Sequence, residues 1–441
     1  MNSYFLKDFF NSLNNNNVKY CVLRNYQLLP ESTGGSDLDI LINKKDSKKF
    51  IEIVSKTSQN HGGDIISFIA SDICPRICVL GKKGNGWGVM IDLHYDEISY
   101  RDYTILSNTT VWENTFEHNG IFALNTKSDA LIGLFKELLN NRTCKEKYYT
   151  DFKNLALDEV FLNNVFNSVN KPEIVDVLLQ CKESSYSEKE LTRLVKALDF
   201  YFPKKRLARI KKISKFSRLF KQPGFTIAFL GTDGSGKSTI IENLNKPLYS
   251  AFHKAVYYEH MRPNKFPSIS SLLSNKEEST GPVTNPHGSK PSGFLGSLIR
   301  WSYYLLDYTF GFYIKVWPKK AIRSCVWLFD RYYYDNLIDP KRGRINLPSW
   351  ILKLGKLIIP EPDIILCLGA NAEVIYKRKP ELPFKEVERQ VEELQKFCRT
   401  NKRATWIDTG KDINESISDS LEVIIRVMAK RFESVNFTSK V

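Results

Sequence analysis

The chain has 441 residues, 42% of them hydrophobic and 12% aromatic, which excludes a mainly disordered protein and allows two or three domains. Its eight cysteines include no CxxC pair, which argues against a disulfide framework and a zinc ribbon. The net charge is +15, but no nucleic-acid-binding motif accompanies it, so we expect no specific nucleic-acid partner. We therefore expect a cytoplasmic protein of a reducing compartment.

The N-terminal part is predicted to be α+β. Residues 18–43 read as a strand, a Pro/Gly/Ser-rich turn and a second strand, and residues 48–57 have helical spacing. Residues 87–93 (WGVMIDL) read as a further strand. Apolar residues recur at threes and fours over 128–140 and 145–169, and charged helical segments continue to about residue 198. We predict a core over residues 1–125 and a helical extension over 126–202.

A basic segment follows. Nine Lys and Arg residues and no acid lie between residues 204 and 221, so the rest of the chain carries +6 (15 − 9). Apolar residues recur within it at helical spacing, which predicts an amphipathic helix in a linker over residues 203–223. We favour packing of this helix against one domain. The alternative is peripheral contact with the inner face of the membrane.

From residue 225 onward the pattern changes to short apolar runs alternating with helices, which is typical of an α/β domain with a parallel sheet. We predict this domain over residues 224–435. The predicted strands cover residues 225–230, 255–259, 326–329, 364–368 and 404–407.

The first of these strands leads into GTDGSGKST, which fits the GxxxxGK[ST] phosphate-binding pattern. Glycines let backbone N–H groups curl around a polyphosphate, and the helix that follows adds its positive end. Lys237 is expected to neutralise the β- and γ-phosphates of ATP, and the Ser238 hydroxyl to hold Mg²⁺. The predicted nucleotide-binding residues are Gly231, Asp233, Gly234, Ser235, Gly236, Lys237, Ser238 and Thr239.

The apolar run 326–329 ends in Asp330 and Arg331. A carboxylate at the C-terminal end of a parallel strand faces the same crevice as the phosphate-binding loop. Asp330 is therefore a candidate for ordering the water shell of the metal, and Arg331 for gripping a phosphoryl oxygen.

GTDGSGKST, the strand-ending DRY and the later PDIILCLGANAEVIYKRK together resemble the thymidylate kinase family, over residues 225–431. The resemblance implies that Arg262 and Asp233 face the phosphoryl acceptor, with Arg300 and Tyr304 nearby. The loop has no arginine at Gly234 or Ser235, so the resemblance implies a catalytic arginine from the lid. The candidate is Arg378, with Lys379 and Arg389 as helpers; Asp408 and Thr409 fit the family's terminal strand. The resemblance also implies a homodimer.

Several features depart from that family. DRY is followed by YYDNLIDPKRGRI in place of the segment that reads the base, and a Ser/Pro/Asn-rich insertion lies between residues 266 and 296. DRYYYDxxxDPxRxR resembles thymidylate-kinase-like proteins found with bacterial polysaccharide functions, which implies a small-molecule or glycan acceptor. The residues expected on the acceptor side are Asp335, Asp339, Arg342 and Arg344.

A second set of carboxylates lies in the N-terminal part. Asp37 and Asp39 share one face of a strand, and Asp92 on a later strand adds a third carboxylate. Three converging carboxylates suit Mg²⁺. This pattern resembles the minimal (polymerase-β-type) nucleotidyltransferases, although Leu23-Arg24-Asn25 stands where these have a glycine turn. His94 is interpreted as a hydrogen-bonded polar residue rather than a metal ligand.

Taken together, the sequence predicts an ATP- and Mg²⁺-dependent phosphotransferase joined to a nucleotidyltransferase-like domain. The alternatives are an authentic thymidylate kinase and an ATP-binding regulatory module without catalysis.

Overall fold

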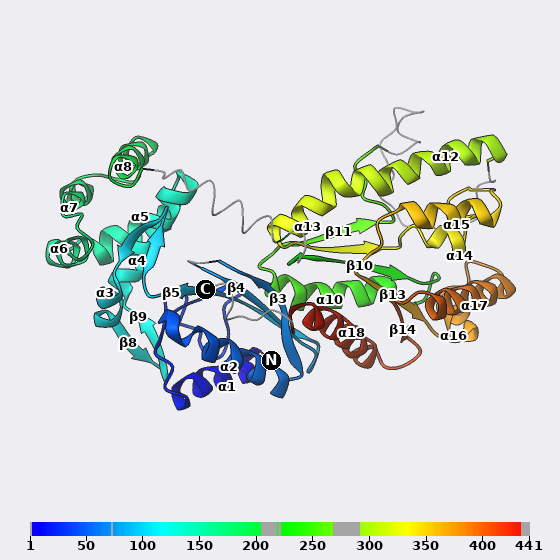
Figure 1. Ribbon diagram of the computed structural model, residues 1–441, viewed down its shortest axis with the longest axis horizontal. Helices are drawn as coiled ribbons and strands as arrows, with labels where there is room; N and C mark the ends of the chain where they lie inside the picture. Colours follow the sequence, from blue (N-terminus) through cyan, green and yellow to red (C-terminus); the bar gives the residue numbers. More distant parts are fainter. Residues whose placement is uncertain (1, 72–73, 204–217, 219–221, 268–291, 434–441) are drawn as a thin grey trace.

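The computed structural model describes residues 2–71, 74–203, 218, 222–267 and 292–433. Within these residues the chain is a mixed α/β protein with two large sheets, one in each half of the sequence (Figure 1). The predicted amphipathic helix of the basic segment and most of the insertion after residue 266 lie outside the described residues.

The N-terminal sheet has the order β3-β4-β5-β2-β1-β9-β8. β2 runs parallel to β5, and β1 runs parallel to β9, whereas the other neighbours are antiparallel. Its strands are β1 (Tyr20–Val22), β2 (Leu38–Ile42), β3 (Gly63–Ile69), β4 (Arg76–Gly81), β5 (Trp87–Tyr95), β8 (Thr115–His118) and β9 (Ile121–Leu124). A separate two-stranded sheet pairs β6 (Ile98–Tyr100) with β7 (Tyr103–Leu106).

Helices α1 (Asn2–Asn15) and α2 (Ser47–Asn60) cover one face of the N-terminal sheet. The other face is apolar as well. In β4, Ile77 and Val79 pack with α1 and α2, whereas Cys78 and Leu80 pack against the C-terminal half of the chain. Because side chains alternate between the two faces of a strand, β4 is apolar throughout.

A helical unit packs beside this sheet, and its apolar core also includes Cys21, Leu41, Ile98 and Leu106 of strands β1, β2, β6 and β7. Its elements are α3 (Asn108–Glu113), α4 (Thr126–Lys136), η2 (Glu137–Asn141), α5 (Glu146–Asp151), η3 (Phe152–Ala156), α6 (Glu159–Ser168), α7 (Ile174–Leu179), η4 (Gln180–Lys182) and α8 (Glu188–Tyr201). η2 and η3 are π-helical.

The C-terminal sheet is parallel throughout, in the order β11-β12-β10-β13-β14. All five predicted strands are confirmed, to within one residue at each end: β10 (Phe225–Leu230), β11 (Val256–His260), β12 (Val326–Asp330), β13 (Ile364–Gly369) and β14 (Ala404–Asp408). Helices flank both faces of the sheet, as in a P-loop kinase fold.

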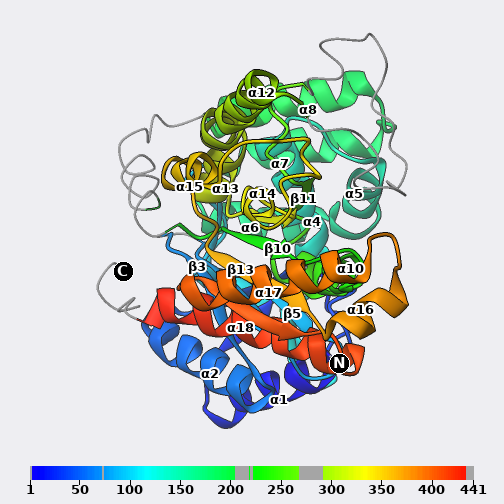
Figure 2. The same cartoon turned by 90° about the vertical axis from the view of Figure 1, so that its right-hand side faces the viewer.

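Helices α10 (Lys237–Ala251) and α18 (Ile413–Glu433) lie between the two sheets (Figures 1 and 2). Strand β5 and helix α10 approach each other closely at Gly88, where a Cβ atom would lie 2.1 Å from the Pro247 carbonyl oxygen of α10. One apolar core therefore joins the two halves of the chain.

The opposite face of the C-terminal sheet is covered by α12 (Phe294–Leu306), the π-helical η5 (Asp307–Val316) and α13 (Trp317–Arg323), together with α17 (Phe384–Thr400). The short helices α14 (Asp335–Ile338) and α15 (Ser349–Ile358) lie on this side, and α16 (Ala372–Arg378) packs against α17. Among the described residues, no helix is both long and apolar enough to cross a bilayer.

Candidate active site

The predicted phosphate-binding loop, residues 231–236, connects β10 to α10, as the sequence predicts. Gly234 and Gly236 have φ values of +83° and +82°, which residues with a Cβ rarely adopt. At Gly231, a Cβ atom would lie 2.4 Å from the Ser235 hydroxyl and 2.5 Å from the Leu368 carbonyl oxygen. The three glycines are therefore needed for the tight curl of this loop.

Lys237 is the first residue of α10 and is buried. Its Nζ donates to the carbonyl oxygens of Gly231 (2.9 Å) and Thr232 (2.8 Å), so the ammonium group lies against the loop. Burial and the neighbouring Arg331 lower the pKa of Lys237 to about 7. The side chain is thus held where a polyphosphate would supply the missing negative charge.

Asp330 ends β12, the strand beside β10. Its Oδ2 accepts from the Tyr258 hydroxyl at 3.0 Å and lies 3.7 Å from His260 Nδ1. Burial acts to raise the pKa of Asp330, but the His260 contact and the Lys237 charge outweigh it and hold the pKa below its usual value.

Asp330 Oδ1 is buried and has no hydrogen-bond partner in the described protein. An ionised carboxylate with an unpartnered buried oxygen, close to the first turn of α10, fits the oxygen ligands or ordered waters of Mg²⁺. Ser238, exposed on that turn, can contribute a hydroxyl. The residues present therefore fit a magnesium-bound nucleotide.

Two arginines meet at Asp233 of the loop. Arg331 is buried with a φ of +72°; its guanidinium donates to Asp233 at 2.7 Å and to the Gly231 carbonyl at 3.3 Å, and also contacts Asp335. Arg342, from the segment that departs from the thymidylate kinase pattern, bonds the other oxygen of Asp233. The segment after β12 thus reaches the phosphate-binding loop.

Arg262 lies in the loop that follows β11, and its guanidinium is 5.3 Å from the centre of the Tyr304 ring. It donates to the fully buried Asp307 at 2.8 Å. Asp307 also accepts from three consecutive backbone N–H groups, those of residues 264–266. Asp307 therefore fixes both the loop and the arginine. No sequence motif predicts a role for Asp307, although it is the only acid between residues 292 and 329.

Three further arginines that the sequence predicts for the site are Arg300, Arg378 and Arg389. Arg300 is on α12 and has a buried Nε without a partner, whereas Arg378 donates to the Thr409 carbonyl at 2.9 Å beyond β14. Arg389 on α17 pairs with Glu386 at 2.6 Å and donates to the Ile338 carbonyl. The side chains shown to bond the loop carboxylate are thus Arg331 and Arg342; the catalytic role of Arg378 stays a prediction.

The remaining residues predicted for the site make contacts within the C-terminal half of the chain. The Cβ atom of Lys379 lies 3.0 Å from the position that a Cβ atom on Gly234 would occupy. The Lys379 ammonium group forms an ion pair with Glu381. Asp339 lies 3.8 Å from the Arg342 guanidinium. Arg344 accepts through its carbonyl from the backbone of Ser292, and the Asp408 carboxylate accepts from the backbone N–H of Gly410.

The N-terminal carboxylates converge as predicted. Asp39 of β2 and Asp92 of β5 are direct neighbours in the parallel register, and Asp37 precedes β2. One oxygen from each of the three carboxylates lies within 4.8 Å of the others. This donor set has the chemistry that a divalent cation such as Mg²⁺ requires.

The same carboxylates are already paired with cationic side chains. Arg24 donates to Asp39 at 2.5 Å, and Arg76 binds Asp92 with two bonds of 2.7 and 3.2 Å. His94 lies 3.6 Å from Asp39; burial acts to lower its pKa, but Cys74 and Asp39 raise it to about 10. A divalent ion would therefore compete with two guanidinium groups for these carboxylates.

No family model and no curated protein matches the chain. Among solved structures, the chain is similar to thymidylate kinase from Ehrlichia chaffeensis, with 20% identity and a TM-score of 0.30 over 46% of this chain and 99% of that one. Thymidylate kinase from Candida albicans matches with 16% identity and a TM-score of 0.34, over 47% and 93% of the two chains. These likenesses concern the fold of about half of the chain.

Proposed function

We propose that the C-terminal half of the chain is an ATP- and Mg²⁺-dependent phosphotransferase. The observation that carries the proposal is the pairing of a glycine-curled loop and its buried Lys237 with the unpartnered, ionised carboxylate oxygen of Asp330. Bound magnesium would neutralise negative charge on the phosphates. Lys237 and the loop N–H groups bind the phosphates, and Asp330 and Ser238 hold the ion and its waters.

The test uses the full chain, Mg²⁺ and ATP labelled at the γ-phosphate, with a panel of nucleotide, sugar and lipid-linked acceptors. Lys237→Ala should abolish transfer, because it removes the cation that faces the phosphates. Lys246→Ala is the matched control, since Lys246 is exposed on the same helix and should leave transfer unchanged. Transfer that persists in the Lys237→Ala variant would refute the proposal.

The acceptor that the sequence favours is a sugar or glycan intermediate, because the segment that reads the base in thymidylate kinases is replaced. The replacing segment supplies Arg342, which bonds Asp233 beside Arg331. Authentic thymidylate kinase activity is the alternative for the acceptor. Activity with dTMP in the same panel decides between the two.

We assign Arg342 to stabilising charge on the transferred phosphoryl group. Arg342→Ala should lower kcat by about a hundredfold or more with little change in ATP affinity, as expected for a contact made in the transition state. Arg378→Ala is the direct comparison, because Arg378 is engaged with the Thr409 carbonyl. A larger kcat loss in Arg378→Ala than in Arg342→Ala would reverse the assignment.

Nucleotidyl transfer is a second candidate function, favoured by the convergence of Asp37, Asp39 and Asp92. It is tested with ATP labelled at the α-phosphate in the Lys237→Ala background, which silences the other site. Transfer that is lost in Asp39→Asn supports this function. Failure of the Lys237→Ala protein to transfer any label assigns the N-terminal half a non-catalytic role.

A further inference from the structure

The three carboxylates of the N-terminal half lie on the face of their sheet that is turned toward the C-terminal half. They are Asp37, Asp39 and Asp92, hereafter the carboxylate site. Asp92 shares its face of β5 with Gly88, which approaches α10, and with Met90, which belongs to the apolar core built by α10 and α18. His253, in the loop after α10, places Nδ1 3.9 Å from Asp37. The carboxylate site is therefore bounded by both halves of the chain.

Each carboxylate of the site faces a guanidinium group. Arg24 spans two of them, since its Nε donates to Asp39 at 2.5 Å and its Nη2 lies 3.7 Å from Asp37. Arg76 binds the third, Asp92, through both Nε and Nη2, at 2.7 and 3.2 Å. Three carboxylates and two guanidinium groups leave one net negative charge among these side chains, which is too little to compensate a divalent ion.

A divalent ion on the carboxylate site would take the oxygens that now balance the two arginines. The Arg24 side chain is only 16% exposed, so it would be left as a largely buried, unpaired charge. The ion therefore needs a companion that brings negative charge to the arginines. Phosphate suits this purpose, because its oxygens accept paired bonds from a guanidinium group as a carboxylate does. The Arg76–Asp92 pair already has this forked geometry.

The loop that carries Arg24 is fixed beside the carboxylates. The backbone N–H of Leu23 donates to the Asp39 carbonyl at 2.9 Å, and Asn25 has a φ of +55°, which turns the chain directly after Arg24. This loop stands where the resemblance to minimal nucleotidyltransferases implies a glycine turn. A glycine turn would offer backbone N–H groups to a phosphate, and here a guanidinium group occupies that place.

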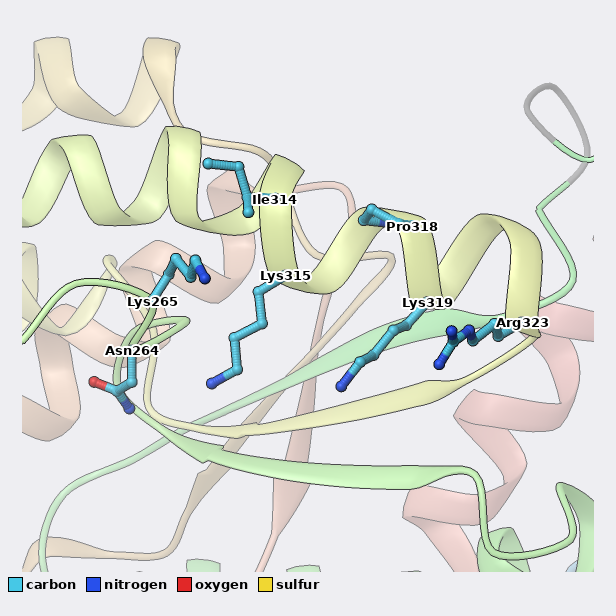
Figure 3. A pocket seen from close by; sticks show the side chains of 7 residues that line it. All are labelled: Asn264, Lys265, Ile314, Lys315, Pro318, Lys319 and Arg323. Atoms are coloured by element: carbon cyan, nitrogen blue, oxygen red, sulfur yellow. The ribbon is translucent and has the colours of Figure 1, made fainter.

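Cationic side chains also gather in a groove beside η5 and α13, which Figure 3 shows from close by. Two of its lysines are engaged within the protein. Lys315 pairs with Glu259 at 2.5 Å, and the Lys319 ammonium group lies 4.2 Å from the centre of the Tyr257 ring. No metal ion would compete for these contacts as it would at the carboxylate site, so the groove lacks the means to release its lysines to a ligand.

We infer that the carboxylate site takes a magnesium-bound polyphosphate, and that Arg24 and Arg76 exchange their carboxylates for its phosphates when the ion binds. The ion releases the arginines, and the phosphates restore their pairing, so the site favours the two ligands together over the ion alone. This inference rests on the second candidate function, nucleotidyl transfer, and assigns the phosphate-binding residues of that site.

The experiment uses the full chain with Lys237→Ala and Asp330→Asn, which remove the cation and the carboxylate of the C-terminal site. Electron paramagnetic resonance measures the affinity for Mn²⁺ alone and for the preformed complex of Mn²⁺ with α,β-methylene-ATP, which nucleotidyl transfer cannot cleave. Arg24→Met should bind Mn²⁺ alone about fivefold more tightly, because it removes a competing cation. The same variant should bind the complex about tenfold more weakly, because it removes charged hydrogen bonds to the phosphates.

These opposite shifts separate a phosphate-binding role from a structural one, which would weaken both affinities. Arg76→Met repeats the test at a side chain that is 39% exposed, so a folded variant is at hand if Arg24→Met does not fold. Lys45→Met is the matched control, since Lys45 is an exposed cation of the same half and should change neither affinity. Inorganic triphosphate with Mn²⁺ should show the same loss as the nucleotide analogue, because the arginines contact the phosphates.

Weakening of both affinities, or no change in either arginine variant when circular dichroism shows it to be folded, would overturn the inference. Retained binding of the triphosphate complex in these variants would overturn it as well. Nucleotidyl transfer is measured separately, with ATP labelled at the α-phosphate. Opposite shifts without transfer uphold the polyphosphate site and refute only its catalysis, whereas transfer with unshifted affinities upholds the catalysis and refutes the exchange.

Discussion

At Lys237, burial and the binding of a polyphosphate have opposite effects on the pKa of the side chain. Burial lowers its pKa to about 7, so at pH 8 the side chain is mostly neutral. A bound polyphosphate favours the ammonium form and raises the pKa again. ATP binding at pH 8 should therefore take up nearly a full proton, and clearly less at pH 6, where Lys237 is already protonated.

This uptake is measured by titration calorimetry in two buffers of different ionisation enthalpy. Lys237→Met, which has no titrating group at this position, should lose the difference between pH 6 and pH 8. The same uptake at both pH values would show that Lys237 is not the group that titrates.

Asp307 shows how one buried carboxylate organises the loop that follows β11. It accepts from Arg262 and from three backbone N–H groups. Asp307→Asn removes the charge and leaves the guanidinium unpaired, which should lower the free energy of unfolding by about 3 kcal/mol. Urea denaturation measures the change. Asp419→Asn, which affects an exposed pair with Lys411, should change it by about 0.5 kcal/mol or less.

Buried polar residues whose partners are not close in sequence, such as Asp307, are difficult to assign from the sequence alone. The phosphate-binding loop and Asp330 were recognised because each is defined by its neighbours along the chain. The pairing of Arg76 with Asp92 was not, because it depends on the antiparallel register of β4 and β5, which places the two residues opposite each other. No role for Asp307 could be predicted, because the backbone N–H groups that it accepts from lie some 40 positions earlier in the chain.

At the scale of elements, the contact between β5 and α10 depends on the absence of a side chain. A Cβ atom on Gly88 would lie 2.1 Å from the Pro247 carbonyl oxygen and 2.8 Å from the Ala251 nitrogen. Gly88→Ala should therefore push the helix from the sheet and cost about 1–3 kcal/mol of unfolding free energy. Gly293→Ala, where a Cβ would meet no atom within 4 Å, should cost about 1 kcal/mol or less. Equal losses in the two variants would mean that this contact is loose.

The five strands of the C-terminal sheet were predicted because each is a short apolar run between helices. β3 and β4 were not predicted. Their apolar residues alternate between two buried faces, and the second face is covered by α10 and α18, which come much later in the sequence. The local sequence pattern does not show that α10 and α18 bury this second face, because the burial occurs only when the two halves of the chain pack together.

At the scale of the whole molecule, this shared core predicts that the two halves unfold together. Residues of β3, β4 and β5 belong to the same apolar cluster as α10 and α18, and α10 begins at the phosphate-binding loop. Calorimetry of the full chain should show one main transition for both sheets. Magnesium-ATP at about a hundred times its Kd should stabilise that transition by about 2.7 kcal/mol.

Hydrogen exchange measures whether the stabilisation reaches the N-terminal sheet. The amides of β4, which belong to the half without the loop, should become more protected when magnesium-ATP binds, because their opening requires loss of the α10 and α18 contact. In Lys237→Ala the same nucleotide concentration should leave β4 exchange unchanged. Two separate transitions, of which only the C-terminal one responds to nucleotide, would show that the halves are energetically independent despite their common core.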